Sequence, residues 1–401
     1  MNFKDIYDVL KTTHGLSRAE IASCLNMSEV DVKNMLSKKR EVTKKHQQLL
    51  QSILDFKESS KPFDLMFDYI RLRFETHDWQ WVVDNIIGIS IMKTLEVLES
   101  GFYGYNQSVR YGDITVMWNH TEEVTQKGVL VVISGRGCRQ LEYQFEMQSR
   151  NWYSFFETII NNDGQMNRID LAIDDEFGLL DVNFFNDKRE AGELEATAKS
   201  SRFYKSGEIP KRSPDYEKIE GATLYIGSQS SKKYICWYEK DYEQYVKTGV
   251  ERQYHTVKNR LEIRVNDKDE CKNLITEWLG NFDLEKTALG VIENGIRFVD
   301  SNKAARAPTN HRWQLFLSRS SGALKLSVQP KKTDIEDTWI WLDKQVSTSM
   351  KMAAIDDTER LLFLIDYAEL KAEHRNKLLA IGKNEADYVP FIDIYGDDDW
   401  A

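Results

Sequence analysis

The chain has 401 residues, of which 41% are hydrophobic and 29% are charged, with 54 lysines and arginines against 64 aspartates and glutamates. These proportions are those of a globular protein, and the length exceeds one ordinary core, so we expect two or three domains. The net charge of −10 does not exclude a nucleic-acid partner, because the distribution of charge matters more than its sum.

No apolar run approaches the roughly 18 residues that cross a bilayer, and the first ten residues carry charges with helical spacing. We therefore expect neither a signal peptide nor a membrane anchor. The four cysteines are scattered without a CxxC pair. This pattern argues against a zinc ribbon or a disulfide framework and favours a reducing, cytoplasmic location.

Residues 1–57 are expected to form a helix-turn-helix domain. Ser17 and Glu20 have the spacing of a capping box, an Asn-Met pair marks a turn, and a serine caps a second helix that leads into a basic segment. Segment 15–22 resembles the phage-repressor type. The alternative is a small helical bundle used for protein contacts. The candidate DNA-binding residues of this domain are Ser28, Lys33, Asn34, Lys38, Lys39 and Arg40.

From residue 63 the pattern changes to strands that follow one another without intervening helices. This favours an α+β domain over residues 63–332, with a largely antiparallel, curved sheet and helices on one face. Residues 152–160 are expected to form a helix, and the charged segment 187–218 a loop or excursion. A helical segment with an acidic tail is expected over 333–401. The predicted strands are 69–74, 111–118, 128–134, 168–174, 223–226, 234–238 and 260–265.

Two of these strands carry charged residues on one face. Asp170 and Asp174 alternate with apolar residues in the first, and Glu262 and Arg264 do so in the second. If the strands are neighbours, their acidic faces form a carboxylate site for a hard cation such as Mg²⁺ or Mn²⁺. The alternative is a pair of amphipathic strands with solvated charged faces.

Residues 223–240 have the pattern of a hairpin whose return strand closes at Tyr238. Ile235 and Trp237 are the apolar pair of that strand, so Tyr238 is expected on the opposite, polar face. A tyrosine is most often a core or interface residue. It attacks a phosphodiester only where its hydroxyl is aimed in line and the phosphate charge is neutralised, and Lys240 and the acidic strands offer such surroundings.

In combination these segments resemble the Rep_trans family, which includes rolling-circle plasmid initiators and relaxases of integrative conjugative elements. The resemblance covers roughly residues 63–342. It includes segment 134–139, which is similar to a hairpin end of the relaxase branch. The other matching pieces are 168–174, 225–228, 235–240, Glu243 and 260–263.

The resemblance implies roles for individual residues. Tyr238 would be the nucleophile that becomes joined to a 5′-phosphate. Lys240 is a second catalytic candidate because of its position close to the tyrosine. Asp170 and Glu262, and less directly Asp174, would hold a divalent metal, Mg²⁺ or Mn²⁺. The seven histidines include no His-x-His pair, which argues against a histidine-bound metal. The further DNA-binding candidates are Arg168 and Arg264.

The combination of this domain with an added helix-turn-helix is more similar to relaxases of conjugative elements than to plasmid initiators. The resemblance therefore implies nicking and rejoining of one strand at an origin of transfer. Its partners would be double- and single-stranded origin DNA, a conjugative coupling protein, accessory DNA-processing proteins and, in a homodimer, a second copy of the chain. The alternatives are a rolling-circle replication initiator with the same chemistry and a DNA-binding regulator without catalysis.

Overall fold

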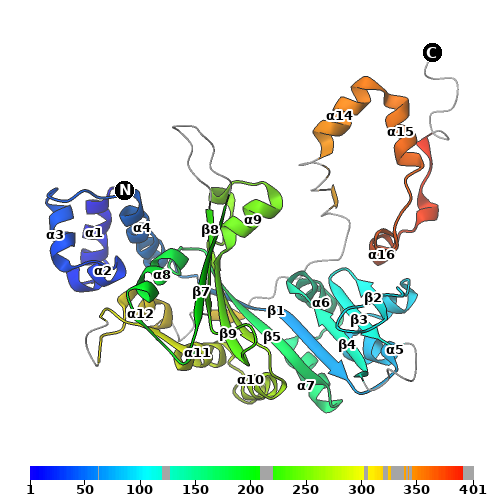
Figure 1. Cartoon of the computed structure of the whole chain (residues 1–401), viewed down its shortest axis with the longest axis horizontal. Helices are drawn as coiled ribbons and strands as arrows, with labels where there is room; N and C mark the ends of the chain where they lie inside the picture. Colours follow the sequence, from blue (N-terminus) through cyan, green and yellow to red (C-terminus); the bar gives the residue numbers. More distant parts are fainter. Residues whose placement is uncertain are drawn as a thin grey trace. The chain divides into compact units, whose positions relative to one another are not determined.

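The computed structural model describes residues 1–61, 63–119, 127–207, 220–301, 306–318, 324–326, 338–339, 342 and 346–391 (Figure 1). The contacts divide the chain into two compact units, Met1–Phe67 with Asp170–Ser327 and Asp68–Ile169 with Val328–Ala401. Each unit is thus assembled from two separate stretches of sequence. Strands β1 (Phe63–Phe74) and β5 (Gln165–Asp175) contribute residues to both.

The first unit begins with four helices, α1 (Phe3–Thr12), α2 (Arg18–Cys24), α3 (Glu29–Leu36) and α4 (Lys44–Glu58). Ser17 and Glu20 form the predicted capping box of α2, and Ser28 caps α3. Between these helices Asn26 takes φ +54°, a left-handed conformation that asparagine tolerates better than most residues. The two helices joined by a tight turn are therefore present as predicted.

The N-terminal helices are fixed to the rest of their unit by α12 (His311–Ser318). The Ser23 hydroxyl, at the end of α2, accepts the His311 backbone N–H at 2.7 Å. Arg312 is fully buried and its guanidinium donates to Leu179 O, Gly178 O, Leu49 O, Cys24 O and the Ser52 hydroxyl. Because a buried guanidinium needs acceptors, this cluster specifies how the helices dock.

Strands β7 (Ser201–Gly207), β8 (Glu220–Ile226), β9 (Lys233–Glu239) and β10 (Asn259–Val265) are antiparallel neighbours, and β5 follows β10 in the sheet. One face carries an aromatic core in which the Trp237 ring lies 4.8 Å from Phe185 and 6.1 Å from Trp313. The helices of this part are α8 (Val182–Glu190), α9 (Lys240–Thr248), α10 (Lys268–Asn281) and α11 (Leu284–Gly295). The short elements are β6 (Leu194–Ala196), η4 (Arg252–Tyr254), β11 (Ile296–Phe298) and β12 (Leu324–Leu326).

The second unit contains an antiparallel sheet of β2 (Gln107–Tyr111), β3 (Ile114–Trp118), β4 (Val129–Ile133) and the second half of β1. Helices α6 (Gly135–Met147) and α7 (Trp152–Asn161) pack with it, α7 as predicted. The mixed architecture of helices and antiparallel sheet confirms the α+β prediction. The remaining elements are α5 (Trp79–Trp81), η1 (Val82–Ile87), η2 (Ser90–Thr94), α14 (Ser347–Asp356), α15 (Thr358–Asp366), α16 (Ala372–Ala380) and η6 (Glu385–Asp387).

Two local predictions are wrong. Segment 134–139 is the first turn of α6 rather than a hairpin end, since the Cys138 N–H donates to Ser134 O at 2.7 Å. A Cβ at Gly137 would lie 2.5 Å from Asp113 O, so this glycine allows α6 to approach the turn between β2 and β3 closely. The described part of 187–218 contains the end of α8, β6 and β7. Strand β7 escaped prediction because most of its residues are exposed, which removes the apolar alternation.

Candidate functional site

Tyr238 lies on the polar face of β9, as the alternation predicts. Trp237 is fully buried in the aromatic core and its indole N–H donates to Leu180 O at 3.0 Å. Successive side chains of a strand point to opposite faces, so Tyr234, Cys236 and Tyr238 share the other face. Tyr238 is half-buried, which leaves part of its ring accessible.

The Tyr238 hydroxyl is hydrogen-bonded to a carboxylate of the neighbouring strand. It donates to Glu262 Oε1 at 2.8 Å, in a register that pairs Glu262 with Cys236 and Arg260 with Tyr238. Glu262 is almost completely buried. A carboxylate at this distance is placed to accept the phenolic proton when the oxygen acts as a nucleophile.

Asp170 and Arg264 complete this group on the same face. Asp170 is 2% exposed, and its Oδ2 lies 3.7 Å from Arg264 Nε. Arg264 Nε also donates to Glu262 Oε2 at 2.7 Å. Burial by itself would lower the pKa of Arg264, but the negative charges of Glu262 and Asp170 outweigh it and raise that pKa. Arg264 therefore stays charged and compensates two buried carboxylates, as buried acids require.

Asp174 is engaged differently from Asp170. Its two carboxylate oxygens accept from Arg260 Nε and Nη2 at 2.6 and 2.8 Å, and both side chains are buried. This bidentate pair satisfies the Asp174 charge within the protein. The structure thus places Asp174 on the predicted face but next to Arg260 rather than in the group around Tyr238 and Glu262.

Lys240 lies beside the tyrosine at the start of α9. Its ammonium nitrogen is 5.5 Å from the centre of the Tyr238 ring, and it forms an ion pair with Glu243. Burial would raise the pKa of Glu243, but Lys240 and Lys247 lower it below its ordinary value. The pair keeps a positive charge close to the tyrosine.

The neighbouring tyrosines have other surroundings. A Cβ at Gly221 would overlap the Tyr242 ring at 1.8 Å, so that ring packs directly on the β8 backbone. Tyr254 is 72% exposed in η4. Tyr234 is buried, and its hydroxyl is 3.5 Å from Arg264 Nη1. Tyr238 is distinguished from these by its hydrogen bond to a buried carboxylate.

A divalent cation such as Mg²⁺ requires hard oxygen donors. Two buried carboxylates supply hard oxygen donors, and Mg²⁺ characteristically takes one or two carboxylates and completes its shell with water and phosphate oxygens. Among the residues that the structure describes, no group of three or more histidines, cysteines or acids could hold a metal. Asp170 and Glu262 fit as a two-carboxylate set whose oxygens also contact Arg264.

The DNA-binding candidates fall in three places. Ser28 and Asn34 belong to α3 or its cap, and exposed Lys33 projects from the same helix. Exposed Lys38, Lys39 and Arg40 follow α3, and Arg40 forms an ion pair with Asp31. Arg264 belongs to the carboxylate group described above. Arg168 lies in the second unit, against the Tyr69 ring.

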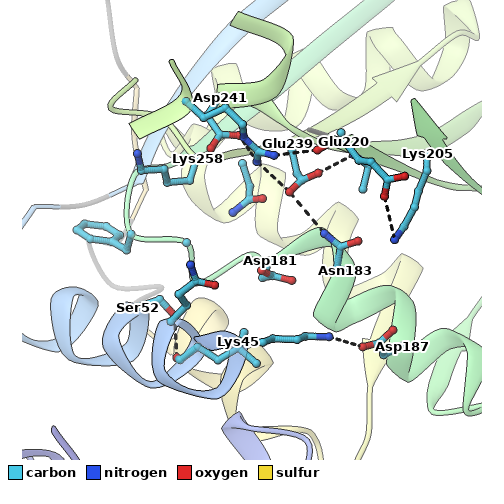
Figure 2. A pocket seen from close by; sticks show the side chains of 18 residues that line it. Lys45, Ser52, Asp181, Asn183, Asp187, Lys205, Glu220, Glu239, Asp241 and Lys258 are labelled. Carbon is cyan, nitrogen blue, oxygen red and sulfur yellow. Dashed lines mark hydrogen bonds and ion pairs between the residues drawn. The ribbon is translucent and has the colours of Figure 1, made fainter. Parts of the chain in front are cut away.

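A polar cavity that the sequence did not indicate lies on the other face of the sheet (Figure 2). It has a volume of about 790 Å³ and is lined by residues of α4, α8, β8 and α9 with mixed charges. Glu239 points into it and accepts from the Ala222 N–H at 2.6 Å and from Arg252 at 3.0 Å. Burial raises the pKa of Glu239, and Arg252 offsets part of that rise. The side chains of Tyr238 and Glu239 thus point to opposite faces of the sheet.

Comparisons with known proteins match most of the chain. The family model described as "Replication initiation factor" (Rep_trans) matches residues 164–362, and the one described as "Rolling Circle replication initiation protein N-terminal domain" matches 64–158. A Bacillus subtilis (strain 168) protein named "Putative DNA relaxase NicK" is 31% identical over 337 residues, covering 82% of this chain and 92% of that protein. A rolling circle replication initiator structure from Geobacillus stearothermophilus has a TM-score of 0.55 at 24% identity, covering 67% of this chain and 99% of that one.

Proposed function

The chain belongs to the Rep_trans family, and from this premise we propose that it nicks and rejoins one strand of DNA at an origin of transfer through a covalent phosphotyrosine intermediate. The observation that carries the proposal is the 2.8 Å hydrogen bond between the Tyr238 hydroxyl and the buried Glu262 carboxylate. It places a proton acceptor against the nucleophilic oxygen.

The proposed reaction follows from this geometry. The Tyr238 oxygen attacks a backbone phosphorus while its proton passes to Glu262 Oε1. The new O–P bond forms as the bond to the 3′-oxygen breaks, and the departing oxygen takes a proton from solvent water to become a free 3′-hydroxyl. Attack by that hydroxyl on the phosphotyrosine reverses the step and restores the strand. Arg264 and Lys240 place positive charge beside the reacting groups.

Asp170 and Glu262 would hold Mg²⁺ or Mn²⁺, with Asp174 a weaker candidate because it is already paired with Arg260. The cation would neutralise charge on the scissile phosphate. Arg264 compensates the negative charges of Asp170 and Glu262. The site therefore does not need the cation in order to fold.

Glu262→Gln and Asp170→Asn are each expected to reduce nicking at least about a hundredfold while leaving the protein folded. The amides preserve shape, which alanine would not do at two buried positions. In Glu262→Gln the amide oxygen still accepts from Tyr238 but no longer takes its proton. The check is the rate of nicking of a labelled substrate across a Mg²⁺ and Mn²⁺ titration. Chelator-resistant nicking by the parent protein would contradict the metal role.

We propose further that the N-terminal helices bind duplex origin DNA through α3 and the basic segment after it. The exposed lysines there suit phosphate contacts, which dominate affinity for DNA. Deleting residues 1–57 would not test this cleanly, because Arg312 would lose the Leu49, Ser52 and Cys24 acceptors.

Point substitutions avoid that difficulty. Lys38→Gln combined with Lys39→Gln is expected to weaken duplex binding and to lower the slope of log K against log salt by about 2, since each lysine that neutralises a phosphate adds about one unit. Nicking of a short single-stranded site should be unaffected. Lys4→Gln combined with Lys11→Gln makes the same charge change on exposed positions of α1 and serves as the control. Equal weakening of duplex binding by the two pairs would show a general charge effect instead of a binding surface.

The proposed partners are origin DNA, a conjugative coupling protein and accessory DNA-processing proteins, with the cytoplasm as the proposed location. The described part of the chain contains no helix that is both long and apolar enough to span a membrane. A second copy of the chain is a further proposed partner, in a homodimer.

A rolling-circle replication initiator is the second candidate function, because both matching family models carry replication initiation in their descriptions. The chemistry would be the same and only the DNA site would differ. Incubating the protein with supercoiled plasmids that carry either a transfer or a replication origin, followed by denaturing analysis of protein–DNA adducts, separates the two. Failure to form an adduct with any substrate would leave a non-catalytic regulator.

A further inference from the structure

The second unit contains a cluster of two tyrosines and two arginines. The guanidinium carbon of Arg71, on β1, is 5.1 Å from the centre of the Tyr103 ring. That of Arg168, on β5, is 4.4 Å from the centre of the Tyr69 ring. The two tyrosine side chains are hydrogen-bonded to each other. We call these four side chains the arginine–tyrosine platform.

The platform is built on a small core of its own. Tyr69 packs against a cluster of Tyr105, Met117, Leu130 and Val132 on one face of the unit's sheet. Arg71 is paired with Val132 across β1 and β4, so it belongs to that same face. The Tyr105 hydroxyl donates to Lys127 O at 2.9 Å and anchors the segment that carries Tyr103. The inner tyrosine is therefore held in place by packing.

Tyr103 has an unusual backbone and an exposed ring. Its φ is +57°, in the left-handed region that residues other than glycine seldom adopt, and its side chain is 53% exposed. The neighbouring Phe102 is 39% exposed. The exposed ring contributes little burial to offset this unfavourable backbone conformation.

The electrostatics of the platform favour an anion with aromatic character. The hydrogen bond between the two tyrosines and the charge of Arg71 lower the pKa of Tyr103, whereas burial and the same hydrogen bond raise that of Tyr69. Arg71 lies over the Tyr103 ring and Arg168 over the Tyr69 ring, and arginine stacks on flat groups while binding phosphate.

We propose that the arginine–tyrosine platform binds single-stranded DNA, with the Tyr103 ring stacked on an unpaired base and Arg71 and Arg168 binding flanking phosphates. The exposed Tyr103 ring can stack only on a base whose flat face is accessible. In a duplex the base faces are covered by neighbouring base pairs, except at the ends. The inference rests on the proposed function, since nicking creates a free single strand that has to be held.

The test measures the affinity for a fluorescent oligo(dT) probe of about 20 nucleotides by fluorescence anisotropy. Loss of one base–aromatic stacking contact lowers such an affinity about tenfold. Tyr103→Gly is expected to show that decrease without a fall in thermal stability, because glycine suits φ +57°. Phe282→Gly is the matched control, since Phe282 is 73% exposed and also left-handed, at φ +60°, at the end of α10. It should bind the probe as the parent protein does.

Arg71→Gln should lower the salt slope of oligo(dT) binding by about 0.7, the value for one phosphate contact on a single strand. Unchanged oligo(dT) affinity in Tyr103→Gly would overturn the inference. So would an equal decrease in affinity for a blunt duplex of the same length, because stacking on an unpaired base would then not explain the effect.

A parallel assay for covalent protein–DNA adducts separates this inference from the proposed function. If the parent protein forms adducts and Tyr103→Gly binds oligo(dT) normally, only the platform is refuted. If the parent protein forms no adduct with any origin substrate but Tyr103→Gly still loses oligo(dT) binding, the nicking function is refuted and the single-strand site stands.

Discussion

Tyr238→Phe is expected to abolish covalent attachment to DNA and to reduce nicking at least about a thousandfold, because it removes the nucleophilic oxygen itself. The fold should survive, since the ring stays in place and Glu262 keeps its contact with Arg264. Losing one hydrogen bond should cost about 1 kcal/mol of stability. Mass spectrometry of peptides from the parent protein, trapped on a labelled oligonucleotide, should place the nucleotide on Tyr238.

Tyr234→Phe is the matched control for this substitution. Tyr234 lies on the same strand and the same face, and its hydroxyl contacts Arg264 rather than Glu262. It should retain covalent attachment. An adduct on Tyr242 or Tyr254, or on Tyr245 of helix α9, would support the same chemistry but assign the nucleophile to another residue. Persistent attachment in Tyr238→Phe would exclude Tyr238 as the nucleophile.

Arg312→Met is expected to lower the free energy of unfolding by about 3–5 kcal/mol, the largest effect on stability that we predict. Methionine fills much of the volume but donates no hydrogen bond. The buried Leu179 carbonyl and the partly buried Gly178 carbonyl, now bound at 2.6 and 2.7 Å, would both lose their donor. Denaturant unfolding followed by tryptophan fluorescence measures the change, and Trp313 beside it is a natural reporter.

Arg375→Met provides the comparison, because Arg375 is an exposed arginine paired with Glu385. Its effect should be within about 0.5 kcal/mol. Because Arg312 contacts Cys24, Leu49 and Ser52, its substitution should also make residues 1–57 more sensitive to limited proteolysis. A small stability change in Arg312→Met would mean that apolar packing, rather than this cluster, holds the N-terminal helices.

Local sequence patterns identified much of the candidate site. Strand alternation places Tyr238 opposite Trp237 and places Asp170 and Glu262 on polar faces, and the structure bears out this placement. Such arguments succeed because the direction of a side chain in a strand depends on its own position in the pleat. They missed the short edge strand β7, which has little apolar alternation, and misassigned the start of α6 because glycines there resemble a turn.

What the sequence by itself determined is local: the helix caps of α2 and α3, the alternation of β9, and the residue types available for phosphodiester chemistry. Only the tertiary structure decided which of these residues meet. The register of β9 and β10 brings Glu262 to Tyr238, and the neighbouring positions of β10 and β5 in the sheet bring Arg260 to Asp174. The docking through Arg312 likewise joins segments more than a hundred residues apart. Pairing between distant segments depends on the packing of the whole unit, and no short window of sequence contains that information.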